Sequence, residues 1–281
     1  DIRTVNPNVF SKLDAYSGPR LVEYHDNNPC YRIVDNEIML MDMAPVNEMS
    51  MRSAGNLEQD KKYKVTVEAE YKVDEYDILI LSAKESSGLK QWLTENGYKI
   101  PGTAAAVLDP YIKNNLKFFV VKVDADRLAQ KGTGTMSPLQ IGFNSPKFML
   151  PIRLGMANAD GDQDMIVYGL TKKGRIECTN YRTVEIPTNR NVPTFVRDNF
   201  SSFYKDLFNK AYKYQGRNAV FLEYAWNVSP SFRGMKCDPC VGPPPISRDL
   251  SQAGVYWNGN VHFTRLHVRY SQEKFAQDLF F

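Results

Sequence analysis

The sequence predicts an α+β fold in which mixed, largely antiparallel sheets are flanked by helices. Residues 61–73 alternate apolar and polar side chains, as a half-buried strand does, and residues 194–214 repeat apolar side chains at helical spacing. Strands and helices follow one another without the regular strand–helix repeat of a parallel sheet. A chain of 281 residues can form a single domain, which we expect here, or two packed halves, 1–145 and 146–281.

The first element is expected to be a helix. Asn6 and Pro7 predict its start, because asparagine caps helix N-termini and proline fits the first helical turn. Gly18 and Pro19 predict its end. Residues 29–60 contain several methionines without a clear period, so we expect a long irregular connection there.

The middle of the chain predicts one sheet with helices. Residues 76–82 are apolar on both faces, which is typical of an interior strand. The elements expected around it are a strand at 61–73, a helix at 87–97, two helices at 103–115 broken at Pro110, a strand at 118–123 and a short helix near 127–131.

The second half predicts further strands and the longest helix. We expect a three-stranded meander, with Pro151 indicating that its first strand lies at an edge or carries a bulge. The predicted elements are strands at 148–156, 165–170 and 175–186, a helix at 194–214, a strand at 219–226, a Pro/Gly-rich loop at 229–247, a helix at 247–254 and a closing strand at 261–270.

Charge and hydropathy limit the classes of partner. Lysine and arginine total 35 against 32 acidic residues, a net charge of only +3, so nucleic acid is not an expected partner. No apolar stretch approaches the roughly 20 residues of a transmembrane helix. The chain starts at Asp1 without methionine or a secretory signal, so we expect that an upstream segment has been removed.

The cysteines leave alternatives open. Cys237 and Cys240 have the spacing of a redox dithiol, but the prolines at 243–245 cannot continue a helix that would activate a thiolate. A structural disulfide between Cys237 and Cys240 is therefore favoured, with thiol–disulfide chemistry as the alternative. A zinc site completed by Cys30 and Cys178 is disfavoured because a second paired spacing is missing, and the pairing of these two cysteines stays open.

Charged residues on apolar strands form the other candidate sites. Glu223 shares the parity of its apolar neighbours, so we expect a buried ion pair with Arg153, in preference to a catalytic acid. Arg265, His267 and Arg269 share one face of the closing strand and are candidates for anion binding, although a solvated face explains them equally well.

A calcium loop is a further hypothesis. Asp160, Asp162 and Asp164 offer oxygen ligands at alternating positions, but they lack the distal glutamate of an EF-hand. Asp-Gly between two strands is already a hairpin signal, so a turn is favoured over a metal site. We expect no cofactor, no resident metal and no catalytic residue, because nucleotide-binding, nucleophile-elbow and histidine-triad motifs are missing from the sequence.

Several segments resemble a bacterial family called domain of unknown function 2330. The resemblance spans nearly the whole chain, and the segments that carry it are residues 13–24 (LDAYSGPRLVEY), 75–83 (EYDILILSA), 145–155 (SPKFMLPIRLG), 179–184 (TNYRTV), 221–226 (FLEYAW), 237–240 (CDPC) and 264–270 (TRLHVRY). It implies an exported bacterial protein with a signal peptide and an additional N-terminal segment, and it implies no activity.

These observations lead to one functional expectation and two alternatives. We expect a non-enzymatic binding or structural module of the cell envelope, periplasmic or extracellular. Its partner would be an envelope protein or the chain's own upstream segment. Trp257, Phe280 and Phe281 are expected to be exposed and to anchor that partner. The alternatives are a thiol–disulfide oxidoreductase using Cys237 and Cys240, and a calcium-dependent adhesion module.

Overall fold

The computed structural model gives the placement of most of the chain. It describes residues 1–22, 58–60, 63–100, 104–132, 134–157, 159–188, 190–228, 245, 247–257 and 259–281. Cys30, Cys237 and Cys240 lie outside these residues, as do most of the predicted connection at 29–60 and most of the predicted loop at 229–247.

The first sheet is antiparallel and follows the predicted order closely. Its strands, in spatial order, are β2 (Glu58–Asp60), β3 (Val65–Val73), β4 (Tyr76–Ala83) and β5 (Phe118–Val123). The strand predicted to be interior is β4, which lies between β3 and β5 and buries Ile78 and Leu81 completely. Helix α2 (Ser86–Glu95) packs on this sheet through Leu89 and Trp92. The strands and the helix of this unit were therefore predicted correctly, although a register shift between Val67 and Ala69 interrupts the alternation in β3.

The second sheet contains the longer strands. In spatial order they are β8 (Gln163–Thr171), β11 (Val261–Tyr270), β10 (Ala219–Val228) and β9 (Arg182–Glu185). Strand β11 is antiparallel to both of its neighbours, and only the short β9 runs parallel to β10. The mixed, largely antiparallel α+β class predicted from the sequence is confirmed.

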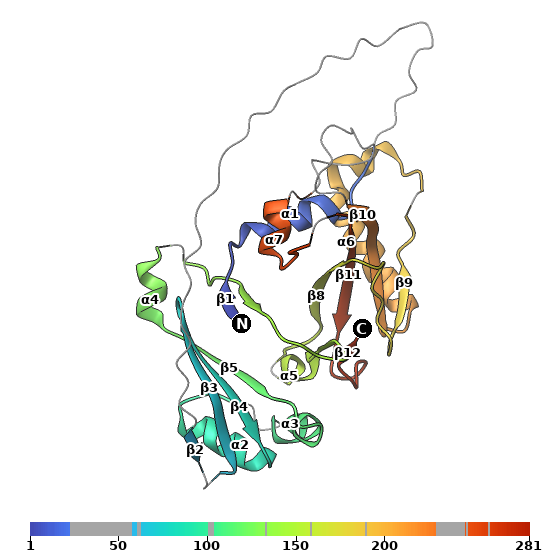
Figure 1. Ribbon diagram of the computed structural model, residues 1–281. Coiled ribbons are helices and arrows are strands. Elements are labelled where there is room, and N and C mark those ends of the chain that lie inside the picture. Colours follow the sequence, from blue (N-terminus) through green and yellow to red (C-terminus); the bar gives the residue numbers. More distant parts are fainter. Residues whose placement is uncertain are drawn as a thin grey trace, which may run out of the picture.

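Both faces of the second sheet are covered. Helix α1 (Asn8–Ser17) packs on one face near Phe263, and helix α6 (Phe200–Tyr214), preceded by the 3-10 helix η1 (Thr194–Asn199), packs on the same face near Phe221. The opposite face carries helix α5 (Ile152–Met156) and the end of the chain, where Phe275 and Leu279 are fully buried. The sheet is thus the middle layer of three (Figure 1).

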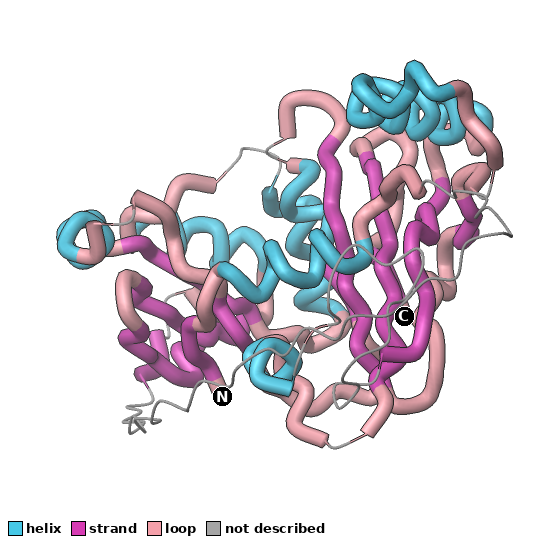
Figure 2. The backbone as a smooth tube through the Cα atoms, turned by 90° about the horizontal axis from the view of Figure 1, so that it is seen from above, coloured by secondary structure: helices cyan, strands magenta, loops and turns pink. Residues whose placement is uncertain are grey.

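Short strand pairs and helices connect the two sheets. Strand β1 (Ile2–Thr4) pairs with β6 (Leu139–Ile141), and β7 (Met149–Leu150) pairs with β12 (Leu279–Phe280). The remaining helices are α3 (Ala104–Lys113), α4 (Ala125–Gln130) and α7 (Ser247–Gln252). Seen from above, helices lie between the two groups of strands (Figure 2).

Three predicted elements differ from the structure. The strand predicted at 148–156 ends after Leu150, because Pro151 is followed by helix α5. The predicted meander is wrong, since β9 pairs with β10 and not with β8. The two helices predicted at 103–115 are a single helix that contains Pro110. In each case the predicted segment was too short for its pattern of apolar residues to identify the type of element or the strand that it pairs with.

Candidate functional site

The alternation of β11 separates an apolar face from a charged one. Leu266 and Val268 point into the core beneath α5 and are fully buried. Arg265, His267 and Arg269 point to the opposite face, because successive residues of a strand alternate sides. There they contact Asp14 of α1 and Phe208 and Asn209 of α6. The prediction that these three side chains share one face is confirmed.

Regular alternation in β10 places Glu223 on this charged face, because Phe221, two residues before it, pairs with His267. Leu222 pairs with Leu266 and Tyr224 pairs with Arg265, so Glu223 is the extra residue of a bulge. The bulge turns the following residue, Tyr224, to the same face as Arg265. The Glu223 side chain is only 2% exposed.

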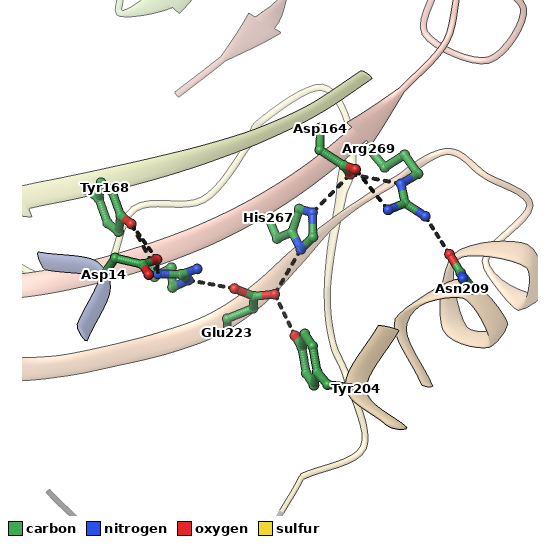
Figure 3. A network of polar contacts seen from close by, with 9 residues as sticks. Asp14, Asp164, Tyr168, Tyr204, Asn209, Glu223, His267 and Arg269 are labelled. Atoms are coloured by element: carbon green, nitrogen blue, oxygen red, sulfur yellow. Dashed lines mark hydrogen bonds and ion pairs between the residues drawn. The ribbon is translucent and has the colours of Figure 1, made fainter. Parts of the chain in front are cut away.

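Glu223 binds three side chains from two elements, β11 and α6 (Figure 3). Its Oε2 accepts a hydrogen bond from Nε of Arg265 at 2.6 Å, and its Oε1 lies 2.9 Å from Nδ1 of His267. The hydroxyl of Tyr204, on α6, donates to the same Oε1 at 2.5 Å. The carboxylate therefore joins β10 to β11 and to the helix above them.

The network extends at both ends to exposed acids. Nε2 of His267 lies 3.0 Å from Oδ1 of Asp164 on β8, and Arg269 donates to both oxygens of Asp164 at 2.8 Å. At the other end, Nη1 of Arg265 donates to Oδ1 of Asp14 on α1 at 2.6 Å. We call these residues, with Tyr168, Tyr204 and Asn209, the polar network (Figure 3).

The electrostatics keep the carboxylates ionised. Burial raises the pKa of Glu223, but hydrogen bonds from His267, Tyr204 and Arg265 outweigh burial and leave this pKa below its usual value. Burial also raises the pKa of Asp164, and the hydrogen bonds from Arg269 and His267 again lower it overall. A carboxylate that stays charged at neutral pH cannot donate a proton, so neither residue is suited to act as a general acid.

His267 has no ring nitrogen left for a ligand. Both nitrogens face carboxylate oxygens, and the ring stacks on Phe208 with centroids 3.9 Å apart. Each ring nitrogen therefore already has a partner within the chain. Chemically, the arrangement cross-links α1, α6 and three strands, and its hydrogen bonds go to other groups of the chain.

The predicted ion pair of Glu223 with Arg153 is wrong in its partner. Glu223 is buried and held by an arginine, but that arginine is Arg265. Arg153 lies on α5, which packs on the opposite face of the sheet, and its backbone N–H donates to Asp278. The error has a clear cause, because residues 148–156 were interpreted as a strand.

The side chains of the predicted anion site are already paired, and so is Asp164 of the predicted calcium loop. Arg265, His267 and Arg269 hold acids of the chain itself. Asp164 belongs to the polar network and Asp160 is exposed, while Gly161 has φ +86°, as the favoured turn requires. Over the described ranges, no group of three or more His, Cys, Asp or Glu side chains is arranged to hold a metal ion.

The cysteine predictions fall mostly outside the described residues. The disulfide and the redox alternative at Cys237 and Cys240 stay predictions, because neither residue is described. Cys178 is buried and free, and its Sγ lies 3.2 Å from Oδ1 of Asn180. The expectation that Trp257, Phe280 and Phe281 are exposed is wrong, since all three are partly buried and Phe281 packs against Phe148.

Sequence reasoning missed four members of the polar network. They are Asp14, Tyr168, Tyr204 and Asn209. Asp14 and Arg265 are 251 residues apart, and a local pattern contains no signal for such a contact. Tyr204 lies one turn after Phe200 on the predicted helix, and a hydroxyl at this spacing from an apolar residue is a usable signal for a buried polar partner.

The fold and the site define the class of the protein: an α+β protein with two largely antiparallel sheets and a buried polar network on the second. Among the described residues, no helix has the length and apolar character needed to cross a bilayer. The chain belongs to the family described as "Uncharacterized protein conserved in bacteria (DUF2330)", whose model matches residues 1–281. No curated protein and no solved structure matches it significantly.

Proposed function

We propose that this chain is a non-enzymatic binding or structural module of the bacterial cell envelope. The observation that carries the proposal is the polar network, in which the buried Glu223 carboxylate binds His267 and Arg265 of β11 and Tyr204 of α6. Catalytic acids and bases need an accessible group with a matched pKa. These groups are used to hold the sheet and the helices together.

Exposed apolar side chains support a binding role. Ile141 ends β6, Phe143 and Phe148 lie on the segment that leads from it to β7, and the three side chains are 43%, 64% and 47% exposed. Apolar side chains that gather at a surface mark sites of protein interaction. Phe143 and Phe148 are therefore the proposed partner-binding residues, in place of the aromatic residues near the end of the chain.

Site-specific crosslinking in the native envelope tests the binding role. A photoreactive amino acid at the position of Phe143 is expected to give one crosslinked protein partner, and the crosslink should be lost in Phe148→Ser. The same amino acid at the position of Phe195, which is 73% exposed on η1, is the matched control and should not capture that partner. Recovery of an uncrosslinked monomer at both positions would reject the proposal.

Export is a separate part of the proposal and needs its own test. The family resemblance supports it, since the resemblance implies an exported protein. Intact cells and spheroplasts of the source bacterium are treated with protease, and the natural protein is followed with an antibody. We expect digestion only after the outer barrier is opened, or release into the medium, and protection in intact spheroplasts would place the protein in the cytoplasm.

A further inference from the structure

A small cavity lies where helices α3 and α5 meet, between the two sheets. Its volume is about 130 Å³, and it is bounded by α3 beside the first sheet, by α5 beneath the second, and by the segment that follows β11. None of the polar network residues lines it. Ligand sites commonly form between packed units of a fold, and this cavity is independent of the function proposed above.

Arg153 supplies the cationic group of this cavity. Its guanidinium has no carboxylate partner and no hydrogen-bond acceptor among the described residues. The nearby acid Asp278 is already used, because its Oδ1 accepts from the hydroxyl of Tyr111 at 2.8 Å and from the backbone N–H of Arg153 at 3.1 Å. An arginine fork that faces a cavity with its donors unused is suited to binding a carboxylate through two parallel hydrogen bonds.

The rest of the lining is mostly apolar. Met156 and Phe275 are buried, and Val107 and Ala276 complete the apolar side. Gln272 is the second polar side chain, and its amide also has no partner within the described ranges. A single cation against apolar walls favours an anion with one charge and a hydrocarbon body over a dianion such as phosphate.

The volume limits the size of the ligand. An engineered apolar cavity of roughly 150 Å³ in another protein accommodates benzene, so a cavity of about 130 Å³ holds a molecule of roughly that size. We propose that this cavity binds a short-chain aliphatic monocarboxylate. Its carboxylate would bind Arg153 and Gln272, and its hydrocarbon chain would pack against Met156 and Phe275.

Calorimetric titration with butyrate, acetate and inorganic phosphate tests the proposal on the full chain. Butyrate is expected to bind more tightly than acetate, and phosphate least. Arg153→Gln should weaken butyrate binding at least about tenfold, the loss expected for a charge-assisted pair of hydrogen bonds. Arg190→Gln, which removes an equally charged but exposed side chain, is the matched control and should bind butyrate like the wild type.

A second variant keeps the test decisive if Arg153→Gln folds poorly. Ala276→Leu fills the cavity while leaving Arg153 in place, and the exposed position of Ala276 tolerates the larger side chain. We expect it to abolish butyrate binding and to affect acetate less. Absence of butyrate binding to the wild type, equal affinity for phosphate and butyrate, or unchanged butyrate binding in Ala276→Leu would each overturn the proposal.

Discussion

Glu223 is the residue that joins the polar network, because its two carboxylate oxygens bind side chains from β11 and α6. Glu223→Gln keeps the shape of the side chain but leaves the buried Arg265 guanidinium with less negative charge beside it. Breaking one side of a buried ion pair costs about 3 kcal/mol or more. We therefore expect urea denaturation at pH 7 to show a free energy of unfolding lower by about that amount.

An exposed ion pair provides the control for this measurement. Glu177 pairs with Arg175, and both side chains are more than 40% exposed, at 49% and 44%. Glu177→Gln is expected to change the free energy of unfolding by less than about 1 kcal/mol, because exposed pairs are screened by water. An equal decrease of the free energy of unfolding in Glu223→Gln and Glu177→Gln would contradict the stabilising role of the buried polar network.

Glu75 makes the stability of the first sheet depend on acid pH. Burial opposes its ionisation, but hydrogen bonds from Nζ of Lys131 and from Ser137 outweigh burial and lower its pKa to about 2. A carboxyl group whose pKa is lower in the folded chain than in the unfolded chain stabilises the fold at pH values above its ordinary pKa. That stabilisation is lost as the pH falls toward the folded-state pKa.

The matched variant for this prediction is Glu75→Gln. Near neutral pH the wild type should be more stable than the variant, and the difference should shrink as the pH is lowered from 4.5 to about 2. Thermal unfolding of both proteins across this range measures the difference. A difference that stays constant with pH would show that the ionised Glu75 carboxylate contributes nothing.

At the scale of elements, the sequence pattern predicts which segments form strands and helices, but it does not predict which distant residues come into contact. The strands β3 and β4 and the helix α2 were predicted correctly as elements, because each depends only on neighbouring residues. The single buried face predicted for β3 is wrong, because a register shift between Val67 and Ala69 moves the later apolar residues to the other face. The bulge at Glu223 was not predicted, since parity alone places Ala225 on the same face. In the structure Ala225 packs with the core on the other side of the sheet.

Helix α6 is fixed to the second sheet chiefly by Phe208. Its ring centroid lies 4.9 Å from that of Phe221 and 3.9 Å from that of His267, and the residue is 2% exposed. Phe208→Ala removes these contacts and leaves a cavity under the helix, at a cost of about 4 kcal/mol. We expect urea denaturation to show this loss of stability.

The comparison for Phe208→Ala is Phe195→Ala on η1. Phe195 is 73% exposed, so its truncation should change the free energy of unfolding by no more than about 0.5 kcal/mol. The two variants remove the same side chain from adjacent helical segments. A small loss in Phe208→Ala would show that α6 is held by contacts other than the aromatic cluster.

At the scale of the whole molecule, the first helix of the chain packs with the strands formed by its last part. Helix α1 packs on the second sheet with Val228 and Phe263, although the first sheet lies between them in the sequence. The chain therefore leaves the second unit after α1, forms the first sheet, and returns. The fold class followed from local periodicity. This long-range packing did not, because local periodicity carries no information about which distant elements pack together.

This packing predicts that residues 146–281 alone do not form a stable sheet. Without α1, the aromatic side chains of Tyr168, Tyr224 and Phe263 lose their cover, and Arg265 loses the Asp14 carboxylate. Tryptophan fluorescence during urea denaturation should show a broad, weak transition for this fragment. A fragment in which residues 1–22 are joined to 146–281 by a flexible linker should unfold cooperatively, because it restores that cover. Equally cooperative unfolding of both fragments would mean that the second sheet folds without α1, and that the contact between them adds no stability.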